Sequence, residues 1–131
     1  MENTSTINAT PQRPEGNRFV NAAVMIADIN ASIDILKRES TWAESDRNAI
    51  TVFKSSQLAN TVVGLKEGAR LEKQSVDGLV SIHMLEGDIS LSTAEKTLYA
   101  KTNDMLWIEA DTGFQIEATR ESFFLLTITY Q

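Results

Sequence analysis

The chain has 131 residues, 42% of them hydrophobic, which suits one domain with a buried core and is too short for two ordinary domains. It contains no cysteine, so disulfides, thiolate metal sites and cysteine nucleophiles are excluded. The formal net charge of −6 argues against a nucleic-acid partner, because binding a phosphate backbone needs clustered Lys and Arg side chains.

Targeting signals are not evident in the sequence. No apolar run approaches the roughly 20 residues of a membrane span. The first residues lack the basic start and apolar core of a signal peptide. We therefore expect a cytoplasmic protein without a membrane partner.

The N-terminal segment 1–18 is polar and contains Pro11, Pro14 and Gly16, which predicts a flexible tail. A docking arm is the functional alternative for this segment. The single folded domain is then expected over residues 19–131. Within it, the apolar segment 19–27 predicts a short strand that leads into a helix.

One short N-terminal helix is predicted over about residues 28–40. Asp28 or Asn30 can cap it, because a side-chain oxygen satisfies a free N–H group of the first turn. Apolar residues then recur at i, i+4 and i+7, which is one face of an amphipathic helix. Lys37 and Arg38 near its end suit the negative end of the helix dipole.

From Ala49 onward the hydrophobic period changes to two, and turn-forming residues separate many short apolar segments. This spacing predicts an all-β sandwich or barrel. The predicted strands are residues 49–54, 58–66, 70–74, 79–85, 88–93, 96–100, 105–108, 114–118 and 122–130.

Two stretches within these strands have a distinctive spacing. In the first, five residues separate Gly68 from Gln74, and the stretch ends at Gly87. Val76 and Val80 lie between them. The second stretch contains Asn103, Glu109, Asp111, Phe114 and Ala118.

This layout resembles the two consensus motifs of the cupin superfamily, whose first motif places His-x-His and a Glu between two glycines. Gln74, Val76, Val80 and Phe114 stand where the family has its metal ligands. The resemblance covers about residues 45–129. It implies an all-β, small cupin-like double-stranded β-helix, or jelly-roll barrel, over about residues 45–130. It also implies a homodimer, often formed by sheet edges.

The residues at the ligand positions predict that the barrel holds no metal and needs no cofactor. Valine and phenylalanine donate no lone pair, and one glutamine carbonyl cannot hold a transition metal alone. Alternation along the strands instead predicts a mostly apolar lumen between the two sheets. Its candidate lining residues are Gln74, Val76, Val80, Ile82, Met84, Trp107, Phe114 and Ile116.

Two interpretations of this lumen remain open. An apolar pocket that contains the amide of Gln74 would bind a small, mostly apolar molecule. Alternatively, side chains fill the former metal site and the barrel is a packed core. Trp107 either lines the pocket or packs in an interface.

Other polar residues carry weaker signals. His83, the only histidine, is expected on the face opposite Ile82 and Met84, away from the lumen. Glu109 and Asp111 lie just before Phe114 near the expected barrel mouth, where paired carboxylates are candidates for acid–base chemistry.

A polar cluster precedes the first barrel strand. Asp46, Arg47 and Asn48 favour an Arg–carboxylate pair as a structural clamp, with a substrate-carboxylate site as the alternative. Trp42 is expected to anchor the helix to the sheet.

The sequence thus supports a metal-free, non-enzymatic protein that binds a small molecule or acts as a dimeric interaction module. The alternative is a metal-independent enzyme, of the isomerase or lyase type, that uses side chains alone. A third hypothesis, an unconventional metal site, requires His83 to turn inward beside carboxylates.

Overall fold

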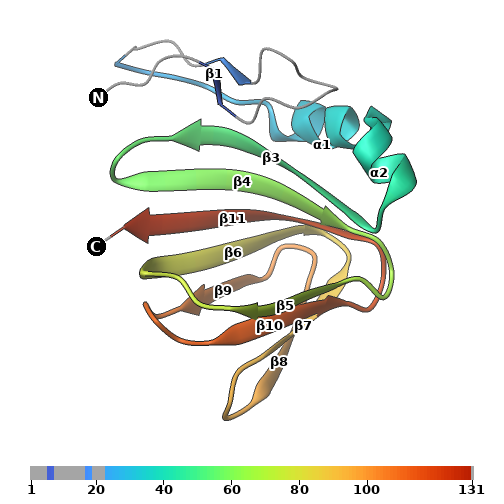
Figure 1. Ribbon diagram of the computed structural model, residues 1–131, viewed down its shortest axis with the longest axis vertical. Coiled ribbons are helices and arrows are strands. Elements are labelled where there is room, and N and C mark those ends of the chain that lie inside the picture. Colours follow the sequence, from blue (N-terminus) through green and yellow to red (C-terminus); the bar gives the residue numbers. More distant parts are fainter. Residues whose placement is uncertain (1–5, 8–16, 19–22, 131) are drawn as a thin grey trace.

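The computed structural model describes residues 6–7, 17–18 and 23–130, and strands dominate this part of the chain (Figure 1). Its helices are α1 (Ile29–Arg38) and α2 (Ser40–Glu44). Its strands are β1 (Thr6–Ile7), β2 (Asn17–Arg18), β3 (Arg47–Lys54), β4 (Leu58–Leu65), β5 (Arg70–Gln74), β6 (Gly78–Glu86), β7 (Asp88–Ser92), β8 (Thr97–Lys101), β9 (Met105–Ile108), β10 (Phe114–Ala118) and β11 (Ser122–Tyr130).

Two antiparallel sheets form the barrel in the described residues. The five-stranded sheet has the order β3-β4-β11-β6-β9, and the four-stranded sheet has the order β5-β10-β7-β8. In Figure 1 the C-terminal strand β11 lies between β4 and β6, and β10 lies between β5 and β7, so each sheet brings together strands from distant parts of the sequence. All nine strands predicted from residue 49 onward are confirmed, each to within two residues at its ends.

The main hydrophobic core lies between these two sheets. Alternate residues of β6, which lies between β11 and β9, are almost completely buried, namely Val80, Ile82 and Met84. They pack with Phe114 and Ile116 from the opposite sheet in one cluster. Period-two alternation thus sends one side of each sheet inward, as the sequence pattern predicts.

Helix α1 begins as predicted, because the Asp28 carboxylate accepts a hydrogen bond from the Ala31 amide at 3.0 Å. Ile33 and Leu36 are buried on its inner face. They form a second cluster, outside the barrel, with Trp42 and with Phe123 of β11. Trp42 therefore anchors the helical segment to the five-stranded sheet, as expected.

The predicted helix is present as α1, which ends at Arg38, but it is not the only helix, because a second short helix, α2, follows directly. Glu39 separates the two helices, because its backbone is extended, with φ −81° and ψ 150°. The buried amide of Asn48 donates to the carbonyl of Leu36 at 3.0 Å and to the carboxylate of Glu39 at 2.9 Å. A side chain from β3 thus satisfies the end of α1 and holds the break in place.

The structure describes only part of the N-terminal segment, so it tests only some of the predictions for that segment. Residues 23–28 form no strand, so the described part of the predicted strand 19–27 is wrong. Strands β1 and β2 pair with each other inside the segment predicted to be a flexible tail. The rest of that segment, residues 1–5 and 8–16, lies outside the described residues. No helix in the described part of the chain is long and apolar enough to cross a membrane.

Candidate functional site

The two glycines that frame the first motif have structural reasons to be glycine. Gly68 has φ +86° and Gly87 has φ +101°, in the region that side-chain-bearing residues rarely adopt. A Cβ on Gly87 would also stand 2.5 Å from the carbonyl oxygen of Glu121. Turn geometry therefore explains the two glycines of the motif, whichever residues occupy the positions of the metal ligands.

Side chains fill the space where the family resemblance places a metal. Val80 and Phe114 belong to the buried core cluster, and Val76 packs against it. Ile82, Met84 and Ile116 occupy the same cluster. For these lumen candidates the predicted inward direction is confirmed, and the barrel interior is a packed apolar core.

Gln74 does not point into this core, which corrects the prediction of a buried amide. Its side chain is exposed, and its amide donates to the carbonyl of Glu72. Strand β5 ends at Gln74, and its pairing with β10 is irregular between Phe114 and Ile116. Alternation cannot be extrapolated through a bulge and past the end of a strand, so the predicted direction fails here.

Trp107 does not line the lumen either, contrary to the prediction. In β9 the inward residues are Leu106 and Ile108, which pack with the core cluster. Trp107 lies between them in sequence and is 65% exposed on the outer face of the five-stranded sheet. His83 also faces outward, as predicted, because its neighbours Ile82 and Met84 are both buried.

The donor set at the expected metal position does not fit a divalent metal. Val76, Val80 and Phe114 carry no lone pair, and Gln74 is exposed, with its amide bonded to the Glu72 carbonyl. Across the described residues, no group of three His, Cys, Asp or Glu side chains is placed to hold a metal ion. The hypothesis that His83 turns inward to build an unconventional site is wrong, because His83 faces away from the core.

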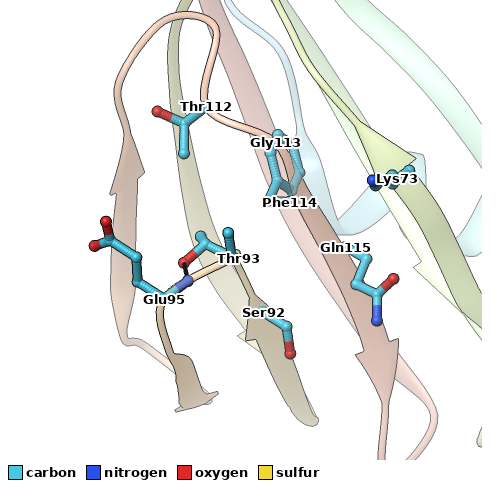
Figure 2. Close-up of a pocket in the computed structure, with 9 residues that line it drawn as sticks. Lys73, Ser92, Thr93, Glu95, Thr112, Gly113, Phe114 and Gln115 are labelled. Carbon is cyan, nitrogen blue, oxygen red and sulfur yellow. Dashed lines mark hydrogen bonds between the residues drawn. The ribbon is translucent and has the colours of Figure 1, made fainter.

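A cleft of about 540 Å³ lies at the end of the barrel where β5 and β7 end and β10 begins. Figure 2 shows Thr112 and Gly113 on the loop before β10, with Thr93 and Glu95 on the turn after β7. The turn is held by the Thr93 hydroxyl, which accepts a hydrogen bond from the Glu95 amide at 3.2 Å. Among the described residues, those that line the cleft are Lys73, Ser92, Thr93, Ala94, Glu95, Thr112, Gly113, Phe114 and Gln115.

Polar side chains predominate among the residues around this mouth cleft, although apolar atoms make up the larger part of its surface, and the cleft contains few of the predicted residues. Phe114 is the only lumen candidate in its lining. Glu109 and Asp111, the carboxylates proposed for acid–base chemistry, are exposed and do not line the cleft. Lys73, Glu95 and Gln115 have no special sequence spacing, so only the folded arrangement of three strand ends reveals them together.

The predicted Arg–carboxylate clamp is present at the start of β3. The Arg47 guanidinium donates to both oxygens of Asp46, from Nε at 2.8 Å and from Nη2 at 3.3 Å. This hydrogen bonding lowers the pKa of Asp46 and raises the pKa of Arg47. Each side chain of the pair is satisfied by its sequence neighbour, which is the structural interpretation of the cluster.

Replacing Asp46 by asparagine is expected to cause a small loss of stability at neutral pH that disappears in acid. Because the folded-state pKa of Asp46 is lowered, the pair stabilises the fold above the ordinary carboxyl pKa of 3.8. The contribution is lost as the pH falls through the lowered value, and exposure keeps it small. Urea midpoints of both proteins between about pH 7 and about pH 2 would test this. A gap that stays constant into acid would contradict it.

Comparisons with known proteins place the fold. No protein-family model matches the sequence, and no curated protein matches it significantly. A cupin superfamily protein from Desulfitobacterium hafniense has a TM-score of 0.65 at 12% identity, over 67% of this chain and 81% of that one. A conserved protein of unknown function from Streptococcus pyogenes has a TM-score of 0.64 at 16% identity, over 99% and 98%. The salicylate 1,2-dioxygenase from Pseudoaminobacter salicylatoxidans has a TM-score of 0.71 at 11% identity, over 79% and 32%.

Similarity at such low identity establishes the fold alone. The chain has the all-β, jelly-roll barrel fold of cupin proteins, with two short helices in the described residues, so the predicted fold class is confirmed. The similar structures include an enzyme and a protein of unknown function, and the fold therefore does not choose between these roles.

Proposed function

We propose that this protein is a homodimeric interaction module whose barrel serves as a scaffold rather than as a binding chamber. The observation that carries the proposal is the packed interior, because buried side chains of both sheets occupy the family's usual ligand space. Val80, Ile82, Met84 and Ile116 are each at most 1% exposed. A core packed in this way favours a scaffold over a binding chamber.

The composition of the exterior supports the same proposal. Several large apolar side chains are exposed, among them Trp107, Met105 and Leu79 on the five-stranded sheet. Exposed apolar residues that gather on one surface are typical of protein–protein interfaces. A protein partner bound to this surface would cover these side chains, and such a role requires no chemistry inside the barrel.

A second candidate function is the binding of a small polar molecule in the mouth cleft. Its lining offers the ammonium of Lys73, the amide of Gln115 and the hydroxyl of Thr112 around one opening (Figure 2). Such groups suit a small molecule that carries hydroxyl or carboxylate groups. The enzyme alternative receives less support, because Glu109 and Asp111 do not line this cleft.

Native mass spectrometry of the protein purified without added metal would test both candidates. We expect a mass of twice the chain with no small-molecule adduct under gentle conditions. A dimer that carries a stoichiometric organic adduct would favour the mouth cleft, and loss of that adduct in a Lys73→Ala variant would locate it there. A monomer at every concentration tested would overturn the interaction module.

A further inference from the structure

The outer faces of the two sheets differ sharply in chemistry. On the four-stranded sheet the outward positions of β5, β7 and β10 carry charged and polar side chains. Arg70 and Glu117 form an ion pair there at 3.5 Å, and Ser90 and Gln115 lie close by on β7 and β10. A solvent-facing side of an antiparallel sheet normally has this polar character.

The outward positions of β6, β9 and β11 have a different character, and we call this surface the β6–β9–β11 face. It comprises Leu79, Ser81, His83, Leu85, Met105, Trp107, Leu125, Thr127 and Thr129. Their outward direction follows from alternation, since their strand neighbours belong to the barrel core. None of these nine residues is an Asp, Glu, Lys or Arg, although the chain carries a net charge of −6.

Strand register arranges this face in continuous rows. One row runs across three strands through Met105, His83 and Leu125. The next row runs through Trp107, Ser81 and Thr127. Helices α1 and α2 pack mainly on β3 and β4. Leu85 and Leu125 pack against the helical cluster, so the open part of the face lies toward β9, around Met105 and Trp107.

The apolar surface continues beyond these rows on the same side of the sheet. Leu125 also lines a groove of about 490 Å³ between the segment 23–29 and strands β3, β4 and β11. Ile26, on the rim of this groove, is 97% exposed. With strands about 4.8 Å apart, the three strands of the face span roughly 14 Å, and about six residues along them span roughly 20 Å. That footprint, on the order of 300 Å² before side-chain relief, supplies part of the roughly 800 Å² per partner of a standard interface, and the groove beside Leu125 extends it.

We propose that a second copy of this chain docks on the β6–β9–β11 face, sheet against sheet, with Trp107 as the central anchor. This inference rests on the proposed dimer and names its surface. A charged partner would find no group of opposite charge on this face. Two copies of the chain are both acidic, but these faces can meet without repulsion because neither carries an Asp, Glu, Lys or Arg side chain. A two-fold contact uses one patch on both copies, as such a self-matching face requires.

The β8 edge of the four-stranded sheet is the competing surface. Leu98 and Tyr99 are exposed there, and the family resemblance favours dimers formed by sheet edges. Tyr99 is 77% exposed, more than Trp107. Its neighbours in register are Ser90 and, beyond β7, Glu117, so it stands alone on a polar surface.

The test compares Trp107→Glu and Met105→Glu with the matched control Tyr99→Glu on the β8 edge. Light scattering coupled to size-exclusion chromatography across a dilution series gives the dimer dissociation constant of each protein. We expect each face variant to raise it by roughly 30-fold or more, as loss of a central anchor does. We expect the control to leave it within about twofold of wild type. Far-ultraviolet circular dichroism at the same concentrations confirms that every variant is folded.

The outcomes separate this inference from the function on which it rests. A wild-type dimer that is unchanged by both face variants overturns the assignment of the face and leaves the dimer standing. Dissociation of the Tyr99→Glu variant alone moves the contact to the β8 edge and also overturns the assignment. A wild-type chain that is monomeric throughout the series overturns the dimer and this inference together.

Discussion

Replacing Phe123 by alanine is expected to lower the free energy of unfolding by about 3–5 kcal/mol. The Phe123 ring is fully buried between β11 and the helical segment. Its centroid lies 5.5 Å from that of Trp42, and the Lys37 ammonium stands 5.0 Å from it. Gly64, opposite Phe123 in the register, leaves the space that the ring occupies. The substitution would therefore open a cavity and loosen the attachment of both helices.

The matched control is Tyr99→Ala, which also truncates an aromatic side chain, at a position that is 77% exposed. We expect that change to stay within about 0.5 kcal/mol of wild type. Urea denaturation followed by circular dichroism gives both values. Equal midpoints for the two variants would contradict the packing described here. The total stability of such a domain is about 5–15 kcal/mol, so the Phe123→Ala protein is expected to fold but only marginally.

Replacing Gly87 by alanine is expected to cost about 2–5 kcal/mol, from two causes that act together. The backbone at Gly87 has φ +101°, which strains any residue with a Cβ. The new methyl group would also meet the Glu121 carbonyl and the hydroxyl of Ser122. That hydroxyl accepts a hydrogen bond from the Asp88 amide at 3.0 Å, so moving it disrupts the junction of β6, β7 and β11.

Gly68→Ala separates the two causes. Gly68 also has a positive φ, +86°, but a Cβ there meets no atom within 4 Å. We expect a cost of about 1–2 kcal/mol from backbone strain alone. The difference between the two variants, measured as thermal and urea midpoints, then reports the steric clash at Gly87. If Gly68→Ala proves as damaging as Gly87→Ala, the crowded junction is not the reason that Gly87 is required.

Part of the candidate site was predictable from the sequence because strand alternation is a local property. Val80, Ile82 and Met84 lie in the middle of a nine-residue strand, so a period of two places all three inward. The same rule sends His83 outward. The rule failed for Gln74, at the end of a strand where the register with β10 shifts. The groups of the mouth cleft come from three separate strand ends, and no local pattern connects them.

Local chemistry in the amino-acid sequence by itself determined the strand pattern, the cap of α1 by Asp28 and the chemistry that excludes a metal at Val76, Val80 and Phe114. Each of these depends on neighbouring residues or on the atoms of one side chain. The tertiary structure alone decided which outward-facing side chains the helical segment covers and which stay exposed. It also placed Trp107 outside the barrel and divided the helical segment at Glu39, through an amide on Asn48 nine residues away. These features depend on contacts between distant segments, which periodicity along the chain cannot specify.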